Sequence, residues 1–297
     1  MGGAFVAVAD DATATWWNPA GIATGAYFSM VVERGETTQP ANPTVDRPSW
    51  RNTDSNFAVV FPALGLSYYR LQISEARPGS SAAAGGQAGG SEIRSISAKQ
   101  FGVTIGQTIV RGFVVGATLK LLRGGVVNGT SAAAHPLDDA DALDVPGETH
   151  GDIDLGAMFS TGKLRIGGTL KHASQPTFGS GESAFVVERQ GRVGLALIGG
   201  GRGPIDAVTL DVDADLTKTH TATGRAQYIA GGLEAWFARR RLGIRGGLSR
   251  NIVEPTGTAK STGLSVALRP SVYLDGALTF GNDTARDGWD IGLRVTF

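Results

Sequence analysis

A histidine and a serine stand two positions apart, at His172 and Ser174. On a β-strand that spacing puts both side chains on one face, where an imidazole could activate a hydroxyl as a nucleophile. Such a pair also needs a third group that orients the imidazole. No recognisable third group follows, and the pair sits at a strand end beside Gln175 and Pro176. We therefore predict a strand end that enters an outer loop, and no catalytic residue.

A second group of reactive side chains is a run of carboxylates, at Asp138, Asp139, Asp141, Asp144 and Glu148. Carboxylates at such spacing can hold Ca²⁺, but the glycine-bearing twelve-residue pattern of the common calcium loop is absent. Cysteine is also absent, which excludes disulfides, thiolate zinc sites and a cysteine nucleophile. We predict a solvated acidic loop, no metal site and no cofactor.

Composition narrows the class of protein. Only 18% of the 297 residues are charged, 44 are glycine, and the formal net charge is zero. A neutral chain argues against a nucleic-acid partner, which needs a basic face. No stretch approaches the length of apolar sequence that a transmembrane helix requires.

Period-two alternation of apolar and polar residues dominates instead. In the segment 288–297 every second residue is apolar and those between are polar or small, as in a strand with one greasy face. Fourteen such strands are predicted, at 26–34, 55–61, 64–73, 95–106, 112–123, 152–160, 163–172, 187–198, 207–217, 225–237, 240–249, 260–269, 271–280 and 288–297. The predicted fold class is all-β, a 14-stranded antiparallel transmembrane β-barrel.

The connections between these strands alternate in length. Long polar loops at 35–54, 74–94 and 124–151 are separated by tight links such as Pro62–Ala63 and Thr161–Gly162. Bacterial barrels have long extracellular loops and short periplasmic turns, so both termini are predicted to be periplasmic. A soluble sandwich need not alternate its loops, and a β-solenoid needs a fixed repeat, which is not seen.

Charged side chains occupy the strand phase opposite the apolar residues. Basic groups on the lipid face would cost roughly 2–4 kcal/mol at the midplane, so these side chains are predicted to face a polar lumen. They are Asp152, Asp154, Arg165, Lys171, Asp211, Asp213, Asp215, Arg245, Asp275, Asp290 and Arg294.

Residues 1–24 do not alternate. Asp10 and Asp11 precede a short segment that ends at Trp16 and Trp17. Aspartate suits a helix N-terminus, and the residue before Pro19 is biased out of the helix. One or two helical turns followed by a tight turn are predicted here.

The same segment carries a motif. Gly2 through Ala14, followed by Trp17-Asn18-Pro19-Ala20-Gly21, resembles the amino-terminal signature of the FadL/TodX outer-membrane transporter superfamily, particularly its PorV-like and uncharacterised branches. The resemblance implies an N-terminal hatch, residues 1–24, inside the lumen of a barrel formed by residues 25–297. The residues it assigns to the hatch are Asp10, Asp11, Trp16, Trp17, Asn18, Pro19, Ala20 and Gly21.

The resemblance also implies a function: passive transport of small hydrophobic molecules, fatty-acid-like or aromatic, across a bacterial outer membrane. The implied partners are outer-membrane lipid, the hydrophobic ligand and the barrel-assembly machinery, which would read the C-terminal aromatic Phe297; a monomer is expected. In this superfamily the Gly-Gly-Ala-Phe element usually follows further mature residues. No signal peptide is visible, so Met1 is expected to be internal to a longer chain.

Two other functions stay open. A PorV-like protein would hold cargo proteins during type IX secretion. The second of these functions is that of an outer-membrane lipid hydrolase, because phospholipase A and lipid A deacylase carry a His-x-Ser pair on a strand. Leu164, Ile166 and Leu170 would turn that face of the strand toward lipid.

The third predicted strand is irregular. Leu64, Leu66 and Tyr68 share one face, whereas Leu71 and Ile73 have the opposite parity. A β-bulge near Tyr68, Tyr69 and Arg70 would explain the change. The resemblance implies an inward kink in the third strand that opens a lateral portal. The alternatives are an ordinary bulge, or a boundary where the strand leaves the membrane.

Overall fold

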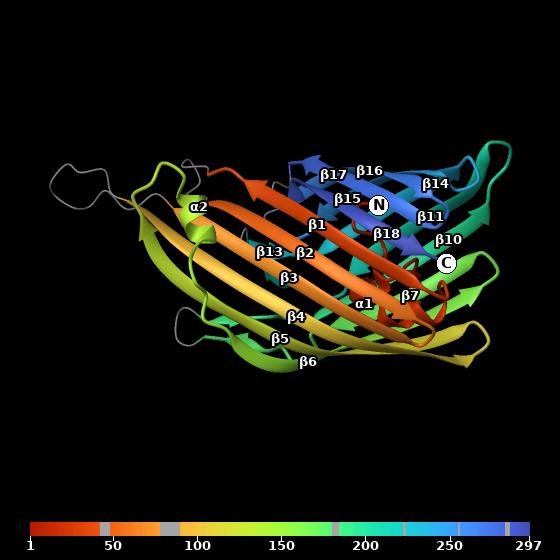
Figure 1. The fold of residues 1–297 in the computed structure, drawn as a ribbon, viewed down its shortest axis with the longest axis horizontal. Coiled ribbons are helices and arrows are strands. Elements are labelled where there is room, and N and C mark those ends of the chain that lie inside the picture. Colours follow the sequence, from red (N-terminus) through yellow and green to blue (C-terminus); the bar gives the residue numbers. More distant parts are fainter. Residues whose placement is uncertain (42–47, 78–89, 180–183, 222–223, 255, 283–285) are drawn as a thin grey trace.

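In the computed structural model, fourteen antiparallel strands form a closed barrel (Figure 1). The structure describes residues 1–41, 48–77, 90–179, 184–221, 224–254, 256–282 and 286–297. Closure pairs each barrel strand with a neighbour on both sides, which lipid demands because it offers no hydrogen bonds to a free sheet edge. The predicted 14-stranded antiparallel barrel is confirmed.

The elements follow one another with few interruptions. The barrel strands are β1 (Ser29–Gln39), β2 (Ser49–Phe61), β3 (Leu64–Arg77), β4 (Ser91–Val110), β5 (Phe113–Ser131), β6 (Glu148–Thr161), β7 (Leu164–Lys171), β10 (Gln190–Gly200), β11 (Ile205–Asp215), β14 (Tyr228–Phe237), β15 (Leu242–Asn251), β16 (Gly257–Arg269), β17 (Val272–Gly281) and β18 (Gly288–Thr296). The remaining elements are α1 (Ala14–Trp17), the 3-10 helix η1 (Pro19–Ala23), α2 (Pro136–Asp141) and two small hairpins, β8 (Thr177–Phe178) with β9 (Phe185–Val186) and β12 (Thr219–Thr221) with β13 (Gly224–Ala226). No helix among the described residues is long and apolar enough to span a membrane.

Short turns gather at one end of the barrel and long connections at the other, where α2 lies (Figure 1). Two predicted loops are shorter than expected, since β1 continues to Gln39, β2 begins at Ser49, β5 continues to Ser131 and β6 begins at Glu148. The strands continue past the apolar band, where apolar side chains are no longer confined to the outer face. Alternation therefore ends before the hydrogen-bonded ladder does. Residues 78–89 of the predicted loop 74–94 lie outside the described part.

The two faces of the wall have opposite chemistry. On β5, Leu119 and Leu121 are 59% and 58% exposed, whereas Thr118 and Lys120 between and beside them are buried. The same alternation runs around the barrel and places the large apolar side chains outside. A protein whose exposed surface is this apolar is suited to lipid rather than water.

The predicted bulge in the third strand is wrong. β3 pairs with β2 and with β4 in unbroken register from Leu64 to Ala76, so Tyr68 points outward, Tyr69 inward and Arg70 outward. The continuous ladder leaves no gap at these residues, and the predicted lateral portal is not formed there. Beyond Tyr69 the strand leaves the apolar band, and apolar residues then occupy its inner face instead of its outer face.

The predicted acidic loop is more ordered than expected. Asp138 and Asp141 of α2 accept hydrogen bonds from Arg51 of β2, at 3.0 and 2.6 Å. Ala140 is buried with Ala76 and Ile93 on the outer face of β3 and β4. The helix therefore packs against the outside of the barrel, at the end with the long connections.

Candidate functional site

The N-terminal segment lies inside the barrel, with η1 against the inner faces of β4, β5 and β6. Asn18 holds it there. Its Oδ1 accepts from the amide of Ala20 at 3.1 Å, while its Nδ2 donates to the carbonyls of Val6 at 2.9 Å and Ala157 of β6 at 3.2 Å. Asn18 is fully buried, so one amide joins two turns of the segment to the wall.

Glycines in the wall make room for this segment. A Cβ at Gly116 would stand 2.3 Å from the carbonyl of Pro19, and one at Gly156 would stand 2.1 Å from Asn18 Oδ1. The inward-facing glycines that meet the segment in this way are Gly65, Gly106, Gly116, Gly156, Gly167, Gly194, Gly232 and Gly247. Much of the glycine on the inner face thus serves close packing between backbone and backbone.

Charged wall residues bind both the backbone and a side chain of the segment. Asp213 accepts hydrogen bonds from the amides of Phe5 and Val6 at 2.8 and 3.0 Å. Arg165 pairs with Asp10 at 3.1 Å. The segment is therefore tied to β7 and β11 as well as to β6.

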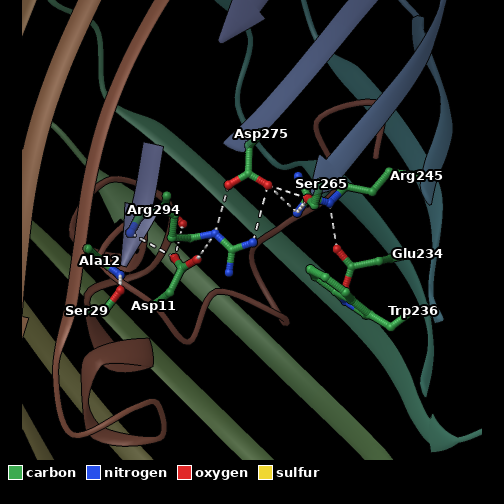
Figure 2. A network of polar contacts seen from close by, with 10 residues as sticks. Asp11, Ala12, Ser29, Glu234, Trp236, Arg245, Ser265, Asp275 and Arg294 are labelled. Atoms are coloured by element: carbon green, nitrogen blue, oxygen red, sulfur yellow. Dashed lines mark hydrogen bonds and ion pairs between the residues drawn. The ribbon is translucent and has the colours of Figure 1, made fainter. Parts of the chain in front are cut away.

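A second network surrounds Asp275 (Figure 2). Its carboxylate accepts from Arg294 at 3.0 Å, from Arg245 at 3.2 Å, and from Ser265. Arg294 also lies 3.8 Å from Asp11 of the N-terminal segment. The network therefore connects four barrel strands, β15 to β18, to the segment.

The predicted luminal charges all lie on the inner face of the wall. Besides those above, Asp215 pairs with Arg192 at 2.6 Å, and the Lys171 ammonium stands 3.1 Å from the ring centre of Trp16. Asp211 is 1% exposed, and neither carboxylate oxygen has a hydrogen-bond partner among the described residues. Asp152 and Asp154 belong to the polar cluster described next, and Asp290 lines the cavity described below.

A buried polar cluster joins β5, β6 and the end of β7. The ligand atoms of Asp152, Asp154 and His172 lie within 4.8 Å of one another. Lys120 Nζ stands among them, at 2.8 and 2.5 Å from the two carboxylates and 3.0 Å from His172 Nδ1. An ammonium of the chain itself therefore occupies the position that a cation would take.

The same cluster decides the arrangement of His172 and Ser174. A carboxylate does reach the imidazole, because Asp152 lies 2.8 Å from His172 Nδ1. The Ser174 hydroxyl, however, donates to Asp152 at 2.6 Å and to the carbonyl of Gly151 at 3.1 Å. The histidine is also buried beside the lumen, with a φ of 55°, rather than facing lipid as predicted. The hydroxyl is not bonded to the imidazole, as nucleophile activation requires.

Beyond the N-terminal segment, toward the long connections, the lumen holds a cavity of about 710 Å³. Thr13, Trp16 and Trp17 of the segment line it together with Leu71 and Ile73 of β3. The other aromatic and aliphatic residues in its lining are Trp50, Tyr69, Ala98, Leu122, Phe185, Val186, Val187 and Tyr228. The exposed surface of the cavity is mostly apolar, as in a small-molecule site, although many lining residues are polar or charged, among them Glu33, Arg286 and Asp290.

The connection after β7 forms part of this lining. Phe178 is fully buried, its ring 4.9 Å from that of His150. Glu188 accepts from the backbone amide of His220 at 2.6 Å and lies 2.6 Å from its Nδ1. Burial tends to raise the pKa of Glu188, but the hydrogen bonds with His220 lower it below its ordinary value. These hydrogen bonds join the connection between β7 and β10 to the connection between β11 and β14 beside the cavity.

Sequence reasoning missed this cavity. Its signal was the opposite parity of Leu71 and Ile73, which we interpreted as a bulge. The same two residues are apolar and face inward, and they mark where the lining of the lumen changes from polar to apolar.

Known structures share the fold. The CymD monoaromatic hydrocarbon channel matches with a TM-score of 0.59 at 13% identity, over 98% of this chain and 94% of that one. A mutant of the TodX monoaromatic hydrocarbon channel matches with 0.61 at 10% identity, over 96% and 94%. A Pseudomonas aeruginosa FadL homologue matches with 0.58 at 8% identity, over 99% and 96%.

No family model matches the sequence, and no curated protein matches it. At these identities the structural likeness shows the fold alone. That fold is the FadL/TodX-type barrel of 14 strands, as the N-terminal signature predicted.

Proposed function

We propose that this chain lets small hydrophobic molecules cross the outer membrane of a bacterium by passive transport. The observation that carries the proposal is the apolar cavity, which lies directly on Trp16 and Trp17 of the N-terminal segment. The structurally similar CymD and TodX proteins are monoaromatic hydrocarbon channels. Their cargo class agrees with the aromatic and aliphatic lining found here.

In this proposal residues 1–24 are the hatch and residues 25–297 the barrel. The hatch fills the lumen below the cavity and is held by Asn18 and by luminal charges. A molecule held in the cavity passes only when the hatch shifts, and no covalent step is involved. The inward-facing glycines of the barrel, which let the hatch pack closely against the wall, hold the hatch in place between such events.

The partners follow from the surfaces. The outward leucines contact outer-membrane lipid, and the 67% exposed Phe297 at the end of β18 is the signal for the barrel-assembly machinery. A monomer suffices, since the cavity lies within one chain. The lipid hydrolase is not proposed, because Ser174 is bonded to Asp152 instead of to His172. The cargo shuttle stays a prediction.

Uptake of radiolabelled toluene by cells that express the barrel tests the proposal. Leu71→Trp places a bulky ring in the cavity and should reduce protein-dependent uptake several-fold. Tyr68→Trp is the matched control, because this neighbouring side chain of β3 is 41% exposed on the outer face. Equal uptake by both variants and the parent, at equal amounts of folded barrel, would contradict transport through the cavity.

A further inference from the structure

The cavity has one acidic side. Glu33 of β1, Asp54 of β2 and Asp290 of β18 all contribute to its lining, and these strands are adjacent in the barrel. None of the three carboxylates forms an ion pair within the part of the chain that the structure describes. They differ in this from Asp215 and Asp275, which pair with arginines of the wall; Glu33 instead accepts a hydrogen bond from Asn56 at 3.0 Å.

Two of these carboxylates converge on one backbone position. Gly35 is the cross-strand neighbour of Asp54 on one side and of Asp290 on the other. The point where a Cβ on Gly35 would stand lies 2.9 Å from Asp54 Oδ1 and 3.1 Å from Asp290 Oδ2. Two carboxylates this close repel each other unless a proton or a cation compensates them. Because position 35 is a glycine, both carboxylates can stand directly over the backbone of β1.

Further polar groups of the cavity lack partners. Asn52 and Asn56 face inward on either side of Asp54, and each has an amide oxygen without a donor among the described residues. Trp50 and Gln100, 5% and 6% exposed, also line the cavity, and each has a nitrogen without an acceptor there. Buried polar groups are normally paired. The amide oxygens of Asn52 and Asn56 need a hydrogen-bond donor, as the carboxylates do, whereas the nitrogens of Trp50 and Gln100 need an acceptor, which water can supply.

The side of the cavity formed by β3, β4 and β5 has different chemistry. Leu71, Ile73, Ala98 and Leu122 are apolar. Two cationic side chains also border the cavity. The Lys171 ammonium stands over the ring of Trp16, and Arg286 lies over the ring of Tyr228 and donates to the carbonyl of Gly2. A molecule that satisfies both sides needs an apolar body and a head group that donates hydrogen bonds and carries positive charge.

We propose that the cavity selects organic cations, molecules with an aryl or alkyl body and an ammonium head. The ammonium lies between Asp54 and Asp290 above Gly35, and the body lies on Leu71 and Ile73. This inference rests on the proposed function and names its substrate class. Neutral hydrocarbons bind the same apolar side but leave the carboxylates uncompensated, and carboxylate ligands are repelled by them.

Three probes of one shape test the charge preference: phenethylamine, phenethyl alcohol and hydrocinnamate, each titrated calorimetrically into the detergent-solubilised barrel. A charge-assisted hydrogen bond is stronger than a neutral one, so the amine should bind about tenfold or more tightly than the alcohol. Hydrocinnamate should bind most weakly. In Asp54→Asn/Asp290→Asn the amine should lose its advantage while the alcohol keeps its affinity.

Glu36→Gln is the matched control, because Glu36 is the neighbour of Gly35 on the outer face of β1. It removes one carboxylate at the same level of the barrel and should leave the amine preference unchanged. If the double variant does not fold, either single variant should still reduce the preference.

Equal binding of amine and alcohol to the parent barrel would overturn the inference and leave the proposed function standing. An amine preference that survives in the double variant would also overturn it. Binding of none of the three probes would contradict the proposed function itself.

Discussion

The two halves of the lumen are built from the same strands by opposite means. In the half that holds the N-terminal segment, the inner wall consists largely of glycines and charged side chains, and the segment packs directly against them. In the half toward the long connections, the inner wall carries Leu71, Ile73 and Leu122 on one side and the three unpaired carboxylates on the other, and a cavity of about 710 Å³ remains. In the proposed function, closure of the pore and binding of a ligand therefore depend on different side chains, which substitutions can separate.

The strongest test of the packed half is a methyl group added to its wall. A Cβ at Gly156 would meet Asn18 Oδ1 at 2.1 Å and the amide of Ala20 at 2.9 Å. Gly156→Ala should destabilise the barrel by about 3 kcal/mol, at the upper end of overpacking effects. The change in unfolding free energy is measured by urea titration of the barrel in detergent.

Gly151 provides the control on the same strand, because a Cβ there meets nothing within 4 Å. Gly151→Ala should change the unfolding free energy by less than about 0.5 kcal/mol, as surface substitutions usually do. If both glycines tolerate alanine equally, the segment is not seated on the wall as described.

Truncation of an apolar side chain should separate the two halves further. Ile22 of η1 is 3% exposed and packs in the cluster with Val31 and Val60. Ile22→Ala should lower the unfolding free energy by about 2 kcal/mol, the low end for a buried isoleucine. The same urea titration applies, and a loss no larger than that of Leu71→Ala would show that the halves are packed alike.

Removal of the Asn18 amide tests the hydrogen bonds that fix the segment. Asn18→Ala leaves the carbonyls of Val6 and Ala157 and the amide of Ala20 without this partner, which should cost about 1–2 kcal/mol. It should also raise the leak of small solutes through barrels reconstituted in liposomes. Asn18→Asp keeps the acceptor for Ala20 but sets a carboxylate oxygen against the carbonyls of Val6 and Ala157, so it should not restore the stability. A tight barrel with Asn18→Ala would contradict the role of this amide in closure.

The smallest effect on stability is expected in the cavity. Leu71→Ala enlarges a space that is already open, so the unfolding free energy should fall by less than about 1 kcal/mol, well below the usual range for a packed leucine. Affinity for phenethyl alcohol should fall several-fold, because apolar contact area is lost. Unchanged affinity together with a large loss of stability would reverse the assignment of the two halves.

The sequence predicted the barrel well because alternation is imposed residue by residue along each strand. Leu119 and Leu121 face lipid and Lys120 does not, and no distant contact is needed to infer it. The motif around Asn18 likewise indicated an internal segment, although the glycines that receive it, such as Gly116 and Gly156, come from strands far along the chain.

What the sequence did not predict depends on those distant contacts. Asp54 and Asp290 are more than 230 residues apart and meet only because β1 closes the barrel against β18. The parity change at Leu71 was visible but ambiguous, since a bulge and a change of environment give the same pattern along one strand. Only the register with β2 and β4 separates them.

A crystal structure of the purified barrel soaked with bromobenzene tests the assignment of the cavity. The bromine gives an anomalous signal that distinguishes the ligand from detergent. The account predicts a peak inside the cavity, between Trp16 and Leu71, and its loss in Leu71→Trp. Bromine peaks confined to the outward-facing leucines, with none inside the barrel, would contradict it.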